Sequence, residues 1–308
     1  MKNKTIAVLM GGWNSEREVS LRSGEAVYQE LLTLGYKAVK IDFGRDIVEK
    51  LREAKPDVVF NALHGQYGED GRVQGLLDIL GIPYTHCGLL SSAVCMDKIL
   101  TNKLCEASQI TSPQFEVLHK NDVEGNKKLI EKIGKPFVIK PVNEGSSVGV
   151  EVILAEHEFD IEKYSWKYGD RLLVEKYIAG QEIQVAVLNG RALGAIEVRP
   201  KHLFYDYECK YTAGMTEYVM PAEISTEKYA EVLQIAQRCY EVASCSGVVR
   251  VDFILNNKNG GDNKFYLLEI NTHPGFTATS LVPKIAKHAG ISFGEIIEFL
   301  IRSAKCGI

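Results

Sequence analysis

The chain has 308 residues, which is long enough for two or three packed units. Hydrophobic residues are 45% and charged residues 25%, a soluble globular balance, and the net charge of −4 does not indicate a broad nucleic-acid-binding face. No apolar run approaches the length of a membrane span. The seven cysteines are scattered, odd in number and without a C-x-x-C pair, which argues against a disulfide framework or a zinc site and favours a reducing cytoplasm.

The first hundred residues alternate between strand and helix patterns. Predicted strands lie at 5–10, 38–42, 57–63 and 82–85, and predicted helices at 20–34, between the second and third strands, and at 73–80. This alternation predicts a parallel sheet covered on both faces, whose ligands bind at the carboxyl ends of the strands. Two loops leave those ends, "GGWNSEREVS" and "HGQYGEDGR".

The middle segment predicts a small α+β unit. A helix covers about 98–109, and the short strands "KPFVIKPV", "VGVEVIL" and "RLLVEKYI" are expected to pair antiparallel. Between the first two lies "KPVNEGSSVGV" (140–150), which is rich in glycine and serine but matches neither a Walker A loop nor G-x-G-x-x-G. It is either a phosphate clamp of another kind or a plain turn.

The third segment begins with a predicted hairpin, because Asn189 and Gly190 separate two apolar runs. A long irregular stretch follows at 199–222, and loops of that length are usually functional or disordered. A helix is expected from Ser225 to about 245, then the strands "GVVRVDFIL" and "KFYLLEIN", and a last helix with Ser292 and Glu295 as its capping box.

The last two strands carry a group of oxygen-bearing side chains. Because side chains alternate along a strand, Arg250 shares a face with Asp252, and Glu269 shares a face with Asn271. A hairpin through "NNKNGGDNK" would bring Asp252, Glu269 and Asn271 together as the all-oxygen set that Mg²⁺ favours. The spacing alone leaves open that these are solvated residues on one sheet face. Arg250 beside them favours a site for a reacting anion.

Other charged residues lie near strand and helix ends. Lysine can serve as a phosphate cation, and Glu175 and Glu182 bracket a strand exit where a base and a ribose could bind. Each of these residues alone is more often a surface charge. Together with the glycine–serine loop and the oxygen cluster, these residues predict a binding site for ATP and Mg²⁺. The candidate phosphate cations are Lys98, Lys140 and Lys176.

The strand-end loops offer contacts for a substrate. Glu16 could hold an ammonium group, whereas a lone histidine such as His64 is more often structural. The turn at Pro274 and Gly275 can expose backbone N–H groups, and a helix beginning at Ser280 is either an anion site or a plain strand–turn–helix connection.

Five stretches in order resemble the D-alanine–D-alanine ligases of the ATP-grasp superfamily: "GGWNSEREVSLRSG", "HGQYGEDGRVQG", "KPVNEGSSVGV", "FYDYECKY" and "VRVDFIL…LLEINTHPG". The resemblance covers essentially the whole chain. It implies a mixed α/β and α+β ATP-grasp architecture, with an N-terminal Rossmann-like domain (1–97) and two α+β subdomains (98–178 and 179–308) that grip ATP. The implied reaction joins two D-alanines through a D-alanyl phosphate, for peptidoglycan precursor synthesis.

The resemblance also implies roles for individual residues in ATP binding and catalysis. Two Mg²⁺ or Mn²⁺ ions would be held by Asp252, Glu269 and Asn271. Arg250 and the N–H of Gly275 would stabilise the oxyanion and the transferred phosphoryl group. The expected ATP contacts are Lys98, Lys140 and Ser147 around the phosphates, Glu175, Lys176 and the backbone near Ile178 at the adenine, and Glu182 at the ribose.

On the substrate side, the resemblance implies that Glu16 binds the first D-alanine ammonium with His64 nearby, while Ser280 and the Leu281 N–H bind the second D-alanine carboxylate. "FYDYECKY" is similar to the family's ω-loop, in which Tyr211 would bond with Glu16 and Ser146, and Lys210 would lie beside the substrate. The Lys–Tyr pair favours an amine as second substrate. A cytoplasmic homodimer without nucleic-acid or membrane partners is expected.

Three alternatives compete with this reading. Another ATP-grasp carboxylate–amine or depsipeptide ligase is disfavoured by the ω-loop and Glu16, and a non-catalytic nucleotide-binding regulator by Arg250 beside the oxygen cluster. A dinucleotide dehydrogenase is disfavoured because "GGWNSE" lacks the third glycine of its fingerprint.

Overall fold

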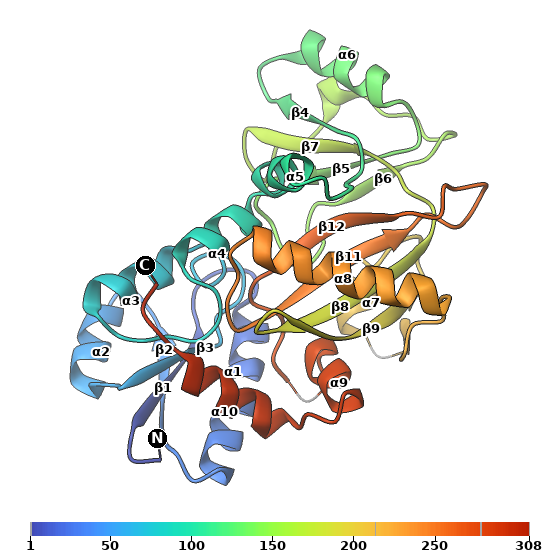
Figure 1. Cartoon of the computed structure of the whole chain (residues 1–308). Helices are drawn as coiled ribbons and strands as arrows, with labels where there is room; N and C mark the ends of the chain where they lie inside the picture. Colours follow the sequence, from blue (N-terminus) through green and yellow to red (C-terminus); the bar gives the residue numbers. More distant parts are fainter. Residues whose placement is uncertain (1, 213, 278, 308) are drawn as a thin grey trace.

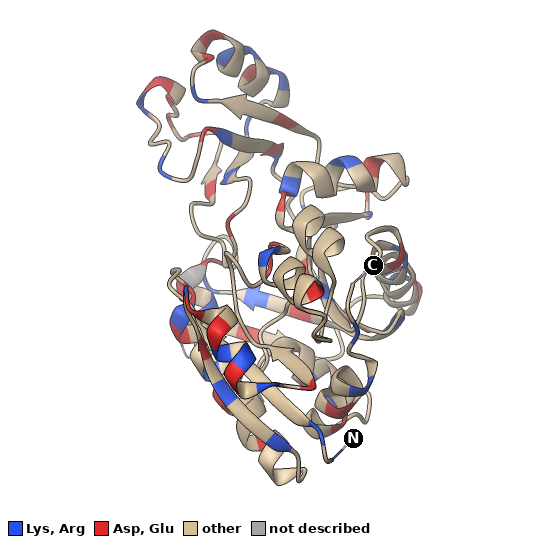
Figure 2. Ribbon diagram, turned by 90° about the vertical axis from the view of Figure 1, so that its left-hand side faces the viewer, with Lys and Arg blue, Asp and Glu red and all other residues tan. Residues whose placement is uncertain are grey.

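The computed structural model describes residues 2–212, 214–277 and 279–307, apart from the side chains of Tyr207 and Tyr211. Three sheets run along the molecule, one in each of the three segments expected from the sequence (Figure 1). The limits of those segments, at residues 97 and 178, remain a proposal. Basic and acidic residues are interspersed along the ribbon (Figure 2), in keeping with the small net charge. No described helix combines the length and apolar character that crossing a membrane requires.

The N-terminal sheet is parallel, as predicted, with the order β2-β1-β3. The expected fourth strand is absent among the described residues, because Tyr84 makes only single bridges to Val59 and Lys305. The helix predicted from residue 20 begins three residues earlier, so Glu16 occupies its N-cap position. The elements are β1 (Thr5–Gly11), α1 (Arg17–Thr33), β2 (Lys37–Phe43), α2 (Ile47–Ala54), β3 (Val58–Asn61), α3 (Arg72–Leu80) and α4 (Leu89–Met96).

The middle sheet is antiparallel, as predicted, with the order β4-β7-β5-β6. The strand expected over "VGVEVIL" is only three residues long, because Ser146, Ser147 and Gly149 all have positive φ and keep the chain in a turn up to residue 150. Its elements are α5 (Lys98–Ala107), β4 (Phe115–His119), α6 (Val123–Ile133), β5 (Phe137–Pro141), β6 (Glu151–Ile153), η1 (Ile161–Lys163) and β7 (Arg171–Lys176).

The third sheet has five antiparallel strands in the order β10-β9-β8-β11-β12. The Asn189–Gly190 hairpin is confirmed by positive φ at both residues, as is the Ser292–Glu295 capping box. The stretch expected to be irregular contains a short helix and an edge strand. The elements are β8 (Gln181–Leu188), β9 (Arg191–Pro200), α7 (Tyr207–Tyr211), β10 (Thr216–Val219), α8 (Thr226–Val242), β11 (Val248–Leu255), β12 (Phe265–Asn271), α9 (Leu281–His288) and α10 (Phe293–Ser303).

One of the two large apolar cores joins the first and third sheets. Ile6 and Val27 of the N-terminal unit belong to the same buried cluster as Phe276, Ile285 and Leu300 near the C-terminus. Because α9 and α10 pack within this shared core, the N-terminal unit is held against the five-stranded sheet.

Candidate active site

Two adjoining cavities lie where the three sheets meet. The larger, of about 770 Å³, lies between the middle and C-terminal sheets, and the smaller, of about 400 Å³, is bounded by the N-terminal loops and the start of α9. Five residues line both cavities and so form their common wall: Lys98, Glu144, Tyr205, Lys210 and Glu269. A molecule in one cavity can therefore reach a molecule in the other.

The larger cavity combines an apolar slot with buried charges. Val138 and Val152 of the middle sheet line it together with Ile254 and Leu268 of the C-terminal sheet, a pair of apolar walls that suits a flat ring. Lys140 and Glu175 also line it and form an ion pair of 2.6 Å, with only 6% and 3% of these residues exposed.

Lys176 has the partners that a lysine in an apolar strand requires. Its Nζ donates to the carbonyl oxygens of Gly134 at 3.1 Å and Lys135 at 3.3 Å, at the turn that precedes β5. Ile178 and Glu182 follow on the same cavity wall. Burial, helped by the charge of Asp252, raises the pKa of Glu182 to about 7, while its Oε1 accepts a 2.8 Å hydrogen bond from Gln184.

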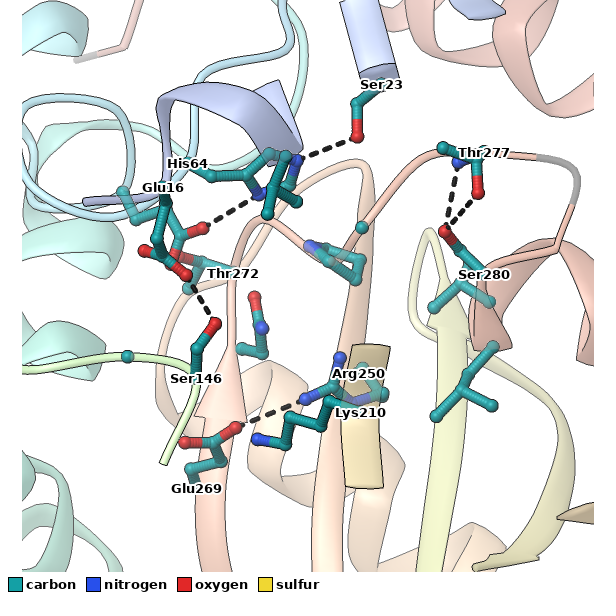
Figure 3. A pocket seen from close by; sticks show the side chains of 18 of the residues that line it. Glu16, Ser23, His64, Ser146, Lys210, Arg250, Glu269, Thr272, Thr277 and Ser280 are labelled. Carbon is teal, nitrogen blue, oxygen red and sulfur yellow. Dashed lines mark hydrogen bonds and ion pairs between the residues drawn. The ribbon is translucent and has the colours of Figure 1, made fainter. Parts of the chain in front are cut away.

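Arg250 holds two carboxylates at the junction of the cavities. Asp252 and Glu269 are register partners on β11 and β12, and a bulge follows directly after Asp252. The guanidinium donates to both oxygens of Asp252, at 2.7 and 2.8 Å, and to Glu269 Oε1 at 3.2 Å (Figure 3 shows the latter bond). The alternation of the two strands therefore brings together the side chains that the sequence predicted.

The two carboxylates differ in their electrostatic surroundings. Burial raises the pKa of Asp252 to about 6, even though Arg250 favours its ionised form. Burial also opposes ionisation of Glu269, but Lys210, Arg250 and Lys98 together lower its pKa to about 2. Glu269 is therefore a carboxylate at neutral pH, and it lies on the wall that both cavities share.

The donor set of this cluster fits a hard divalent cation. Asp252 and Glu269 supply carboxylate oxygens, and Asn271, two residues along β12, supplies an amide oxygen that accepts the His273 N–H at 2.9 Å. Oxygen ligands of this kind are those that Mg²⁺ uses beside substrate phosphates. Asp252 is 4% exposed and Arg250 is the cation beside it and Glu269, so an ion would add positive charge next to two carboxylates that share one guanidinium.

The glycine–serine loop reaches both cavities. Ser146 Oγ donates to Glu16 of the N-terminal unit, and Ser147 Oγ donates to the carbonyl oxygen of Tyr205 at 2.9 Å. Lys98 Nζ donates to the carbonyl oxygen of Glu144 at 2.6 Å, and burial lowers the pKa of Lys98. The loop is thereby tied to all three units.

The smaller cavity contains the predicted contacts for an ammonium group. Burial and the nearby charge of Glu69 raise the pKa of Glu16. His64 is 5% exposed, and its two ring nitrogens lie 3.0 Å from Ser23 Oγ and 3.1 Å from Glu69 Oε1 (Figure 3). These bonds fix the imidazole on the cavity wall.

The opposite end of the smaller cavity is formed by the turn before α9. Ser280 lies at the N-cap position of the helix, and its Oγ accepts the Thr277 N–H at 3.0 Å. A Cβ added to Gly275 would lie 3.3 Å from Ser280 Oγ, so the turn is close-packed around its backbone. Gly275, Ser280 and Leu281 all line the cavity.

All but one of the predicted site residues can be located. Each of them lines one of the two cavities; the exception is Tyr211, whose side chain lies outside the described part of the structure. Sequence reasoning missed Ser23, Glu69 and Tyr205. All three lie inside stretches that the sequence analysis singled out, Ser23 in "GGWNSEREVSLRSG", Glu69 in "HGQYGEDGRVQG" and Tyr205 in "FYDYECKY", but the motifs alone did not show which of their side chains reach the cavities.

The sequence of this chain matches known protein families and individual relatives. The family model described as D-ala D-ala ligase C-terminus matches residues 104–302, and that described as D-ala D-ala ligase N-terminus matches residues 44–87. A D-alanine--D-alanine ligase from Rickettsia canadensis (strain McKiel) is 49% identical over 98% of this chain and 84% of its own length. One from Rickettsia rickettsii (strain Sheila Smith) is 48% identical over 98% of this chain and 92% of its own.

Solved structures agree with the sequence relatives. A D-alanine--D-alanine ligase from Bacillus anthracis complexed with ATP has a TM-score of 0.84 at 32% identity, and 97% of each chain is covered. VanG D-Ala:D-Ser ligase from Enterococcus faecalis has a TM-score of 0.83 at 31% identity, with 97% of this chain and 99% of that chain covered. The fold is that of an ATP-grasp ligase. The chain belongs to the D-alanine–D-alanine ligase family.

Proposed function

We propose that this enzyme uses ATP to join two D-alanines into D-alanyl-D-alanine through a D-alanyl phosphate, as a step in peptidoglycan precursor synthesis. The observation that carries the proposal is the common wall of the two cavities. Lys98, Lys210 and Glu269 border both the slot that suits a nucleotide and the smaller cavity with Glu16 at one end. This arrangement suits transfer of a phosphoryl group between bound molecules.

In the first half-reaction, a carboxylate oxygen of the first D-alanine attacks the γ-phosphorus of ATP, and the bond to the β–γ bridging oxygen breaks to release ADP. Glu16 would hold the ammonium of this D-alanine, with His64 beside it. Lys98, Lys140 and the glycine–serine loop with Ser147 would hold the phosphates. Arg250, 2.7 Å from Asp252, is positioned by its carboxylate partners to meet the developing negative charge.

The rest of the larger cavity would bind the nucleoside. The adenine would lie in the apolar slot near Glu175, Lys176 and the backbone of Ile178, and Glu182 would accept hydrogen bonds from the ribose. Asp252, Glu269 and Asn271 would hold Mg²⁺ or Mn²⁺. When bound, such ions neutralise phosphate charge.

In the second half-reaction, the deprotonated amine of the second D-alanine attacks the acyl carbon. The tetrahedral adduct loses one proton from its nitrogen and expels phosphate to leave the amide. Ser280 and the Leu281 N–H would bind the carboxylate of this second substrate at the start of α9. The N–H of Gly275 and Arg250 would stabilise the oxyanion. Lys210, and Tyr211 as a further proposed contact, would complete the site from the segment that follows β9.

An acyl phosphate must be kept from water before the amine attacks. The bonds from Ser146 to Glu16 and from Ser147 to Tyr205 support a lid role for the glycine–serine loop, because they connect it to the walls of both cavities. On this proposal, the loop couples the capture of ATP to the capture of D-alanine.

The test is D-alanine-dependent ADP formation by the purified protein with ATP and Mg²⁺, combined with chromatographic identification of the product. We expect D-alanyl-D-alanine, and little mixed product when D-lactate or D-serine is added at neutral pH. Turnover with another acid but none with D-alanine would overturn the proposal. Abundant depsipeptide or D-alanyl-D-serine would overturn only the choice of second substrate.

The location and assembly of the enzyme are also proposals. All seven cysteines are free thiols, which supports a reducing cytoplasm as the site of action. We further propose a homodimer, on the family resemblance, and sedimentation of the full chain at several concentrations would test it.

A further inference from the structure

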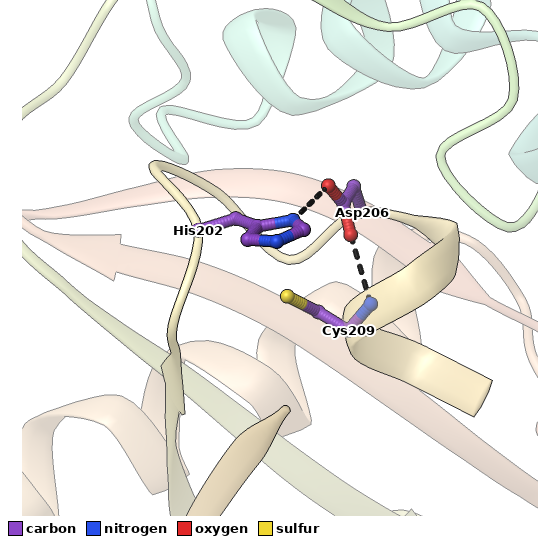
Figure 4. A group of neighbouring side chains, drawn as sticks. All are labelled: His202, Asp206 and Cys209. Atoms are coloured by element: carbon purple, nitrogen blue, oxygen red, sulfur yellow. Dashed lines mark hydrogen bonds and ion pairs between the residues drawn. The ribbon is translucent and has the colours of Figure 1, made fainter. Parts of the chain in front are cut away.

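A second cluster of potential metal ligands lies away from the carboxylates of the active site. His202, Asp206 and Cys209 bring their ligand atoms within 4.8 Å of one another, and this is the one group of three or more His, Cys, Asp or Glu side chains to do so among the described residues (Figure 4). The absence of a C-x-x-C pair argued against a zinc site in the sequence. The fold supplies instead the spacing H-x₃-D-x₂-C around the start of α7.

Local hydrogen bonds already arrange the three side chains. His202 Nδ1 lies 2.6 Å from Asp206 Oδ2, and Asp206 Oδ1 accepts the Cys209 N–H at 2.8 Å (Figure 4). Asp206 has a structural role as the N-cap of α7, and His202 has one as the partner of the Asp206 carboxylate. The Cys209 side chain also contacts the Asp206 carboxylate, so the thiol, the carboxylate and the imidazole already lie side by side.

The chemistry of the set differs from that of the active-site carboxylates. One imidazole, one carboxylate and one thiol favour Zn²⁺ over Mg²⁺, because soft sulfur and nitrogen ligands suit zinc. Tetrahedral bonds of about 2.0–2.3 Å place ligand atoms about 3.5 Å apart. The ligand atoms here lie within 4.8 Å of one another, and His202 Nδ1 is 2.6 Å from Asp206 Oδ2, so shifts of about 1 Å would bring them to that spacing. Three protein ligands leave a fourth position for water or a second molecule.

The site is reachable from solvent and closed at its base. The side chains of His202 and Asp206 are 36% and 26% exposed, whereas Cys209 is 1% exposed and packs in a cluster with Val198 and Tyr205. An ion can therefore arrive at the imidazole and carboxylate and then bind the thiolate beneath them. Binding releases the thiol proton to solvent, since metal ligands must be deprotonated.

We propose that His202, Asp206 and Cys209 bind Zn²⁺ and that the bound ion fixes the conformation of residues 202–209, part of which lines the nucleotide cavity. His202 and Tyr205 both line that cavity, and the carbonyl oxygen of Tyr205 is already bonded to Ser147. An ion that joins residue 202 to residue 209 fixes the short stretch between them, which covers this wall. The site thus links zinc availability to movement of the cavity cover, and it does not depend on the identity of the substrates.

The first test is titration of the full chain with Co²⁺ alone, as a spectroscopic substitute for Zn²⁺. We expect one equivalent to produce near-ultraviolet thiolate-to-metal absorption, and Zn²⁺ to displace it. Cys209→Ser should abolish the band, and His202→Asn should weaken binding at least about tenfold. Cys306→Ser and His288→Asn remove the same chemical groups elsewhere and should leave the titration unchanged. No band in the unsubstituted chain, or a band that survives Cys209→Ser, overturns the site.

A second measurement addresses the effect of the ion on the segment. Trypsin can cut after Lys201 and Lys210, which flank the cluster. Zn²⁺ should slow cleavage at these two bonds severalfold in the unsubstituted chain and not in Cys209→Ser, compared at the same Zn²⁺ concentration. Equal protection of both proteins, or protection of neither, overturns the proposed clamping.

Discussion

Lys140 and Glu175 form a buried ion pair between the neighbouring strands β5 and β7, with Nζ 2.6 Å from Oε1. Both side chains are shielded from water, at 8% and 5% exposure, yet both border the larger cavity. The carboxylate compensates the lysine charge before any ligand arrives. It also fixes the ammonium at the wall where we propose that phosphates bind, so stability and ATP binding depend on the same pair.

Glu175→Gln tests this pair. The substitution leaves the Lys140 ammonium buried without its counter-charge, and removing one partner of a buried pair typically costs about 3–5 kcal/mol. We expect a matching fall in the free energy of unfolding from denaturant titration, together with a higher KM for ATP. Glu162→Gln, which breaks an exposed contact with Lys127, should cost less than about 1 kcal/mol. Equal effects of the two substitutions would contradict a structural role for the buried pair.

Arg250→Lys tests the proposed stabilisation of the transition state. An ammonium cannot reproduce the paired N–H bonds that the guanidinium makes to Asp252. We expect kcat to fall about 10²–10³-fold, with much smaller changes in KM for ATP and D-alanine. Steady-state kinetics on folded protein would measure the changes in kcat and in KM separately. The control is Arg302→Lys, an exposed arginine whose partner is Glu298 on the same helix, and it should be near neutral. A rise in KM at unchanged kcat would limit Arg250 to ground-state binding.

The environment of Glu16 predicts the acid side of the pH profile. Burial and Glu69 raise the pKa of Glu16, and only the ionised carboxylate can hold a substrate ammonium. On the acid side, kcat/KM for D-alanine should therefore fall with an apparent pKa above the usual range for a glutamate. Glu69→Gln removes a like charge, lowers the pKa of Glu16 and should move this fall in kcat/KM to lower pH. The exposed Glu18→Gln serves as the control. An apparent pKa that does not respond to Glu69→Gln would remove Glu16 from this role.

Much of the proposed metal-binding cluster could be predicted from strand alternation. Arg250 and Asp252, two residues apart on β11, do meet Glu269 on β12, because a short hairpin fixes which strands pair. The Lys140–Glu175 bond could not be predicted in this way. It depends on pairing between strands whose residues are 35 positions apart, and nothing in either strand specifies that neighbour.

Short elements were the other limit of prediction. Five residues of α7 and four of β10 lie within the stretch expected to be irregular, and segments of that length carry little periodic signal. β10 forms only because β9 offers it an edge, which is a tertiary effect. The same limit hid the cluster of His202, Asp206 and Cys209, since one turn of helix brings the last of these side chains back to the others.

Two buried histidines behind the smaller cavity predict a loss of stability in mild acid. The rings of His86 and His273 lie 4.1 Å apart, and in the described structure His86 Nε2 and His273 Nδ1 have no hydrogen-bond partner. Burial, together with the charge of His64, lowers the pKa of His86 to about 3. Burial and the other two histidines hold the pKa of His273 well below its ordinary value. The folded protein therefore keeps both rings neutral, whereas the unfolded chain binds protons at about pH 6.5.

The sign of the effect follows from that difference. Above about pH 6.5 the neutral rings make their full contribution to the free energy of unfolding. That contribution is lost as the pH falls from about 6.5 toward the pKa values of the two histidines in the folded protein. The loss is at most about 1.4 kcal/mol per pH unit for each histidine. We expect the free energy of unfolding from denaturant titration to fall between pH 6.5 and pH 5.5. His86→Phe should make this dependence on pH shallower, by the equivalent of about one proton bound on unfolding, because phenylalanine cannot be protonated. The exposed His288→Gln should leave the slope unchanged. A slope that persists in full in His86→Phe would show that other groups take up the protons.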